Sequence, residues 1–247
     1  MPADHIVKSY DEELTKLNRT IVEMGGLAES QLARALQSIT RRDNDLAGRV
    51  VENDVRMDEM DRGVQHLTVR LFALRQPMAK DLRTIVGALR IASDMERIGD
   101  YAKNIGKRAL ALNQAPPVRP VSAIPRMGRL IQEMIKDIVD AYVDQDADQA
   151  LAVWYRDEEV DDMHDSLFRE LLTYMMEDPR NITSCTQLLF IAKNLERMGD
   201  HATNIAENIF FQVRGEPLDD RRPKGGATLD GDVVGNTSRN PDGGTGA

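Results

Sequence analysis

The feature that most constrains this chain is a long internal repeat. Residues 91–105 align with residues 191–205 at an offset of 100, and nine of the 15 positions are identical. Further upstream the matching residues lie 103 apart, so that Asp54 corresponds to Asp157 and Asp58 to Asp161. A deletion of three residues between the two matching blocks reconciles the offsets. A repeat of this length indicates one structural unit present twice, so we expect two copies of the same fold.

Each copy has the pattern of helices. Apolar residues recur every three or four positions, as they do on one face of an α-helix, and no segment alternates like a strand. In the first copy such runs cover residues 14–28, 57–74 and 82–105. We therefore predict an all-α protein made of two tandem, pseudo-symmetric, antiparallel three-helix bundles.

Prolines and glycines indicate where the copies begin and end. Pro116, Pro117, Pro120 and Pro125 lie close together and predict a linker. The last part of the chain is rich in Gly and Pro and has almost nothing to bury. We predict a first repeat over residues 1–113, a linker over 114–123, a second repeat over 124–213 and a disordered tail over 214–247.

Charge and composition exclude several classes of function. A net charge of -9 repels the phosphates of nucleic acids and anionic lipid surfaces. The single Cys185 cannot form an intramolecular disulfide, and the first residues lack the pattern of a secretory signal. No apolar stretch approaches the roughly 20 residues that a membrane span requires. We therefore expect a cytoplasmic protein that binds no nucleic acid and does not insert into a membrane.

Carboxylates in the last helix of each copy are the main candidates for chemistry. The pattern Glu-Arg-x-Gly-Asp places Glu96 and Asp100, like Glu196 and Asp200, on the helix face that continues the apolar stripe. Like charges at this spacing are destabilising, so a cation should compensate them. The preceding helix of each copy carries two more Asp at the same spacing. The eight candidate metal ligands are Asp54, Asp58, Glu96, Asp100, Asp157, Asp161, Glu196 and Asp200.

The spacing leaves two interpretations of these carboxylates open. Such oxygen ligands suit Mg, Mn, Fe or Ca, and Zn is possible. Alternatively, Arg97 and Arg197 or other nearby cations neutralise a solvated acidic face, because ion-pair networks imitate functional sites. Neighbouring polar residues are accessory candidates: Asn104, His164, His201 and Asn204.

Several motifs of enzymes are missing from the sequence. It has no Gly-rich phosphate loop, no His-Glu-x-x-His zinc helix and no nucleophile elbow, so we name no catalytic residue. Two alternatives remain at this point: a metal-dependent hydrolase or oxidase that uses the same carboxylates, and a helical scaffold without metal.

The motifs taken together resemble the PhoU family. Each copy carries Glu-Arg-x-Gly-Asp-x-Ala-x-Asn-Ile, residues 76–83 read Gln-Pro-Met-Ala-x-Asp-Leu-Arg, and the resemblance spans about residues 5–213. It implies a non-enzymatic accessory protein of the high-affinity phosphate transporter. Such a protein keeps the phosphate-starvation two-component response off when phosphate is plentiful.

The resemblance also implies partners and a cofactor. The partners would be the transporter's ATPase subunit, the phosphate-sensing histidine kinase and a second copy of the chain in a homodimer. The cofactor would be a divalent or trivalent metal ion, either Fe, Mn, Mg or Zn, bound by the eight carboxylates. Asp81 is a further accessory candidate because it lies in the Gln-Pro-Met-Ala segment, but residues 177–182 of the second copy offer no counterpart.

Overall fold

The structure is a computed structural model that describes residues 2–75, 78–116 and 123–218. These residues form α-helices and one short 3-10 helix, with no strand among them, as the sequence predicted. The first copy contains α1 (Pro2–Thr40), α2 (Asn44–Glu52), α3 (Asp54–Arg75) and α4 (Ala79–Gln114). The second copy contains α5 (Ala123–Asp144), α6 (Ala147–Tyr155), α7 (Asp157–Glu177), η1 (Pro179–Asn181) and α8 (Ile182–Arg214). Most of the predicted linker and tail, residues 117–122 and 219–247, lies outside the described residues.

The middle helix of each predicted three-helix unit is divided in two. A single residue separates α2 from α3, and another separates α6 from α7, at positions 53 and 156. The shorter half begins in the same way in both copies. Asp43 caps α2 by accepting a hydrogen bond from the Leu46 amide, and Asp146 caps α6 by accepting from the amides of residues 148 and 149. The repeat therefore preserves details of the local backbone as well as the helices.

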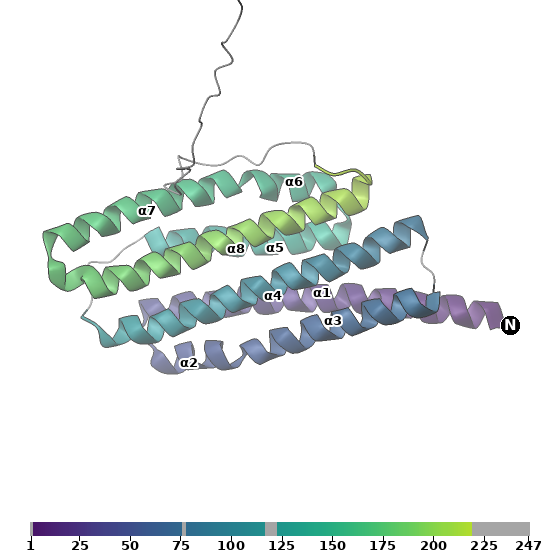
Figure 1. Cartoon of the computed structure of the whole chain (residues 1–247), viewed down its shortest axis with the longest axis horizontal. Coiled ribbons are helices and arrows are strands. Elements are labelled where there is room, and N and C mark those ends of the chain that lie inside the picture. Colours follow the sequence, from purple (N-terminus) through teal and green to yellow (C-terminus); the bar gives the residue numbers. More distant parts are fainter. Residues whose placement is uncertain (1, 76–77, 117–122, 219–247) are drawn as a thin grey trace, which may run out of the picture.

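The two copies pack against each other along their longest helices. In Figure 1, α4 and α8 lie side by side in the middle, with α1 behind α4 and α5 behind α8. The pair α2 and α3 flanks one side of this centre, and α6 and α7 flank the other. One hydrophobic cluster runs through all eight α-helices. The predicted bundles therefore share a single core.

Glycines at equivalent positions let α1 approach α5. Gly25 and Gly128 lie 103 apart, and each faces a branched side chain of the other copy. A Cβ atom on Gly25 would lie 2.3 Å from Cγ2 of Val139, and one on Gly128 would lie 2.3 Å from Cδ1 of Leu36. Both distances are far below van der Waals contact, so only glycine permits this helix spacing.

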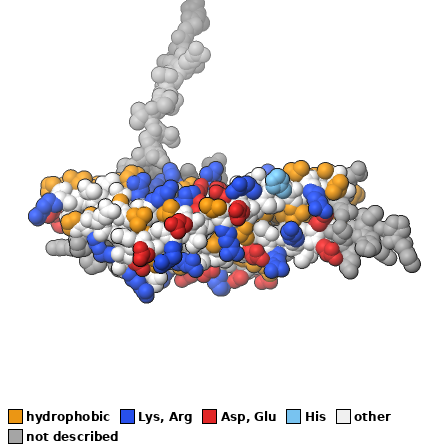
Figure 2. Space-filling view, turned by 90° about the horizontal axis from the view of Figure 1, so that it is seen from below, with side chains coloured by type: hydrophobic (Ala, Val, Ile, Leu, Met, Phe, Trp, Pro, Cys, Tyr) orange, Lys and Arg blue, Asp and Glu red, His pale blue; other side chains and the backbone are white. Residues whose placement is uncertain are grey.

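The outer surface is polar. Side chains of both charges are interspersed on the face formed by α2 and α3, which Figure 2 shows. In the described part of the chain, no helix combines the length and the apolarity that crossing a membrane demands.

Candidate acidic sites of the two copies

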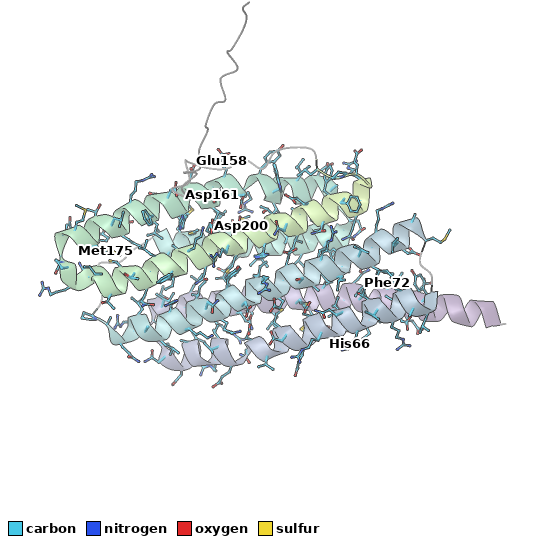
Figure 3. The ribbon with its side chains drawn as sticks, in the orientation of Figure 1. His66, Phe72, Glu158, Asp161, Met175 and Asp200 are labelled. Carbon is cyan, nitrogen blue, oxygen red and sulfur yellow. The ribbon has the colours of Figure 1, made fainter. Side chains whose placement is uncertain are left out.

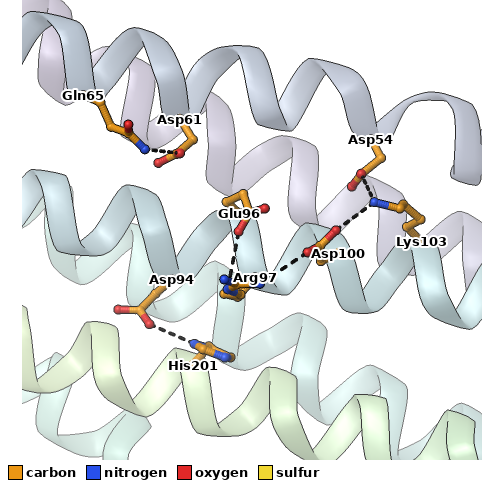
Figure 4. A network of polar contacts seen from close by, with 9 residues as sticks. All are labelled: Asp54, Asp61, Gln65, Asp94, Glu96, Arg97, Asp100, Lys103 and His201. Atoms are coloured by element: carbon orange, nitrogen blue, oxygen red, sulfur yellow. Dashed lines mark hydrogen bonds and ion pairs between the residues drawn. The ribbon is translucent and has the colours of Figure 1, made fainter.

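The acidic residues of the first copy meet between α3 and α4. Asp54 is the first residue of α3 and is only 4% exposed, whereas Glu96 and Asp100 lie on the facing side of α4. The ammonium group of Lys103 lies between the two helices. Its Nζ donates to a carboxylate oxygen of Asp54 and, at 2.8 Å, to Oδ1 of Asp100 (Figure 4). A lysine of α4 therefore joins one carboxylate from each helix.

Arg97 contributes more weakly to the same group. Its Nε lies 3.7 Å from Oε2 of Glu96, and its Nη1 lies 3.6 Å from Oδ2 of Asp100 (Figure 4). The side chain is 57% exposed, so water screens both ion pairs. Lys103 is thus the principal protein cation of this group.

The carboxylates of the first copy influence one another's protonation. Burial raises the pKa of Asp54, the hydrogen bond and charge of Lys103 lower it, and the charges of Asp100 and Asp58 raise it again, with a net increase. Burial also raises the pKa of Glu96, and the charge of Asp100 adds to this effect. Charge effects therefore link the four carboxylates that the spacing paired, Asp54, Asp58, Glu96 and Asp100.

The sequence did not predict two members of this group, Asp61 and Lys103. Asp61 lies one turn after Asp58, and burial raises its pKa, with a further increase from the charge of Asp58. Burial lowers the pKa of Lys103, but its hydrogen bonds to Asp100 and Asp54 outweigh this, so its pKa is raised overall. The spacing in the sequence did indicate that Lys103 lies beside Asp100. It follows Asp100 by three residues, which places both side chains on the same helix face.

The second copy presents its carboxylates between α7 and α8. Asp157 begins α7 and is 3% exposed, as its counterpart Asp54 begins α3. Figure 3 shows Asp161 on α7 and Asp200 on the adjacent α8. Lys193 donates to Oε1 of Glu196 at 2.9 Å. The other oxygen of Glu196, Oε2, is buried and has no hydrogen-bond partner among the described residues.

The two histidines among the accessory candidates interact with residues outside the predicted ligand sets. His201 places its Nδ1 2.8 Å from Oδ1 of Asp94, so it links α8 to α4 instead of facing the carboxylates of its own copy (Figure 4). His164 has its Nδ1 3.7 Å from a carboxylate oxygen of Asp165, its sequence neighbour. Asn104 and Asn204 are half-buried, one turn beyond the acidic residues of α4 and α8.

Asp81 stands apart from the acidic group. It lies in the first turn of α4, about 22 Å along the helix from Glu96 at 1.5 Å per residue. Its neighbour there is Tyr10 of α1. Burial, and then the charge of Asp81, raise the pKa of Tyr10 to about 12. Asp81 therefore belongs to the packing of α1 against α4 and not to the acidic site.

The geometry fits a metal ion only in part. The donors are carboxylate oxygens, the ligand type that hard cations prefer. However, no group of three His, Cys, Asp or Glu among the side chains that the structure describes is placed to hold one ion. Two carboxylate oxygens of the acidic groups, Oδ1 of Asp61 in the first copy and Oε2 of Glu196 in the second, are buried without a hydrogen-bond partner among the described residues and are therefore suited to accept a cation. Metal binding would require the surrounding carboxylates to rotate towards one of them.

Comparison with known proteins identifies the family. A family model described as the PhoU domain matches residues 21–109 and again residues 124–209. The chain belongs to the PhoU family. Each matched range falls within one of the two copies, so the PhoU domain is the repeated unit. The resemblance found in the sequence is thereby confirmed.

Individual PhoU proteins are similar over most of the chain. The phosphate-specific transport system accessory protein PhoU homolog of Caulobacter vibrioides is 55% identical over 222 residues, which cover 90% of this chain and 96% of the relative. The accessory protein PhoU of Escherichia coli K12 is 36% identical over 234 residues, with coverages of 95% and 96%. The crystal structure of PhoU from Pseudomonas aeruginosa superposes with a TM-score of 0.81 at 38% identity and covers 84% of this chain and 100% of that one. The chain is thus an all-helical relative of accessory proteins of phosphate transport.

Proposed function

We propose that this chain is a phosphate-signalling adaptor. It represses the phosphate-starvation two-component response when phosphate is plentiful, and it modulates high-affinity phosphate uptake. It does so through contacts with the ATPase subunit of the transporter and with the sensor histidine kinase. The observation that carries the proposal is the match of both copies to the PhoU domain, together with 55% identity to an accessory protein of phosphate-specific transport.

The proposed output is protein contact and not catalysis. Lys103 and Arg97 form ion pairs with three carboxylates of the first copy, which favours a structural or regulatory role over an acid or base that must be free to react; the three are Asp54, Glu96 and Asp100. Long helices with charged outer faces offer extended surfaces for partners (Figure 2). We place the protein in the cytoplasm, where the ATPase subunit and the kinase domain of the sensor present their surfaces, and we propose that it acts as a homodimer.

A reporter for a phosphate-starvation promoter tests this proposal. Deleting the gene should switch the reporter on in excess phosphate, and supplying the wild-type chain should silence it again. Binding of the purified chain to the isolated ATPase subunit and to the kinase domain should then be measured separately. A deletion strain that keeps the promoter silent in excess phosphate would refute the regulatory function. Repression without binding to either protein would refute the proposed route.

We propose in addition that the second copy binds a metal ion through oxygen ligands from Asp157, Asp161, Glu196 and Asp200. The unpartnered, buried Oε2 of Glu196 favours this, because a buried carboxylate oxygen without a donor is costly. The ion, whether Fe, Mn, Mg or Zn, would give this oxygen a partner and would stabilise the folded state by mass action.

A further inference from the structure

An open hollow lies between α5 and the start of α7 in the second copy. It measures about 190 Å³, which is less than the roughly 300 Å³ at which pockets for drug-sized ligands begin. Leu130 and Met163 contribute apolar side chains to its lining. The rest of the lining is charged and consists of Arg126, Arg129, Glu133, Arg156 and Glu159. A hollow of this size and lining suits a small charged group.

Two of the arginines have no counter-charge in the described part of the chain. Arg126 and Arg129 lie three residues apart on one face of α5, and both side chains are exposed. Neither forms an ion pair or a hydrogen bond with the described residues. Like charges at this spacing repel each other, and an anion placed between them would turn the repulsion into attraction. These two residues therefore supply the positive charge of the hollow.

The contacts of Arg156 explain why Arg129 stays unpaired. Glu133 follows Arg129 by four residues, which is the usual spacing of a helical ion pair. Instead, Oε2 of Glu133 lies 2.7 Å from Nη2 of Arg156, and Nη1 of Arg156 lies 2.8 Å from Oδ2 of Asp137. Arg156 therefore occupies the carboxylate that Arg129 would otherwise bind, and Arg129 remains free for a ligand.

The first copy has no arginine at the equivalent positions. At the offset of 103, the places of these three arginines are taken by Glu23, Gly26 and Asn53. Glu23 is itself paired with Arg19, whose Nε lies 2.9 Å from its Oε1. The positive charge of the hollow is therefore a property of the second copy and not of the helical framework that both copies share.

Glu159 adds a carboxylate to the same hollow. It lies in the first turn of α7, is exposed, and forms no ion pair with the described residues. Such a carboxylate repels an anion without a proton but accepts a hydrogen bond from an anion that carries one. Inorganic phosphate keeps at least one proton at neutral pH, whereas sulfate has none and a phosphate monoester loses its last proton near pH 6. Guanidinium groups match the oxygens of phosphate in their geometry, so the combined lining favours inorganic phosphate.

We propose that this hollow binds inorganic phosphate. Arg126 and Arg129 donate hydrogen bonds to its oxygens, and Glu159 accepts one from its hydroxyl group. All three side chains are exposed, so water screens the contacts and binding is weak and readily reversible. Binding is a property of the chain alone and does not depend on the adaptor function proposed above.

Titrations of the full-length chain, followed by NMR signals of backbone amides and arginine Nε groups, test this proposal. They are run at about pH 7.5, where phosphate monoesters carry no proton, at constant ionic strength and with a chelator that removes any metal ion. The wild type should bind phosphate about tenfold more tightly than sulfate or O-phosphoserine, because one hydrogen bond replaces one repulsion. Glu159→Gln should remove this preference by strengthening the binding of sulfate.

Two charge variants locate the site. The double variant Arg126→Gln/Arg129→Gln should weaken phosphate binding about tenfold, and glutamine preserves the helix propensity. Arg56 is a matched control, because it is exposed, has no ion pair with the described residues and lies on α3, on the other side of the molecule (Figure 1). Arg56→Gln should therefore bind phosphate as the wild type does.

Several results would overturn the proposal. A wild-type chain that binds no phosphate would do so and would leave the adaptor function untouched. Equal affinity for phosphate and sulfate would show that Glu159 selects no proton-bearing anion. Binding that survives the double variant would lie elsewhere, and an equal loss in Arg56→Gln would reflect net charge alone. Should the double variant lose its helical circular dichroism, the single variants Arg126→Gln and Glu159→Gln decide the question.

Discussion

Replacing Gly25 by alanine should show how closely the two copies are packed. The new Cβ would lie 2.3 Å from Cγ2 of Val139, whereas carbon atoms pack best at about 3.5–4.0 Å. Val139 lies inside α5, where a β-branched side chain has one strongly preferred rotamer, so it cannot turn away. The helices α1 and α5 must therefore separate. Overpacking of this kind costs about 1–3 kcal/mol.

A matched control removes the effect of helix propensity. Gly26 is the next residue of α1, is exposed, and has nothing within 4 Å of a Cβ placed on it. Gly26→Ala should therefore stabilise the protein by roughly 0.8–1.0 kcal/mol through propensity alone. Gly25→Ala gains the same stabilisation from helix propensity, but overpacking against Val139 destabilises it. The difference in unfolding free energy between the two variants should thus be about 1–3 kcal/mol in favour of Gly26→Ala.

Urea unfolding followed by circular dichroism measures this difference. Adding Val139→Ala to Gly25→Ala should recover most of the lost stability, because the smaller side chain makes room for the new Cβ. Equal stabilisation by Gly25→Ala and Gly26→Ala would refute the close packing of α1 against α5.

Two further predictions concern the helix caps and pH. Asp43→Ala and Asp146→Ala should each lower the unfolding free energy by about 1 kcal/mol, since each removes the side chain that caps a short helix; unchanged urea midpoints would argue against these caps. Burial raises the pKa of Glu96 in the folded protein, so its ionisation opposes folding, and stability is lost as the pH rises through that raised pKa. With chelator present, Glu96→Gln should therefore be more stable than the wild type at neutral pH, with the advantage vanishing below the ordinary glutamate pKa of about 4.3; a less stable Glu96→Gln at neutral pH would contradict the burial argument.

The acidic group of the first copy was only partly predictable from the sequence. The spacing of Glu96 and Asp100 placed both on one helix face, because an α-helix has a fixed period. The approach of Asp100 to Asp54 followed from the antiparallel packing of neighbouring helices. The sequence did not predict that Lys103 would bridge Asp54 and Asp100, because a long flexible side chain can reach many partners on a helix surface.

The sequence by itself determined the helices and their duplication, since both depend on residues close together in the chain or on direct comparison of its halves. Tertiary structure alone decided how the halves meet. Gly25 and Gly128 bring α1 against α5, and α4 packs along α8, so that one hydrophobic core replaces two. The same packing turned His201 towards Asp94 of the other copy and away from its own acidic residues. Periodicity fixes which face of a helix is apolar, but not which of several apolar faces it will meet, because any of them would remove similar surface from water.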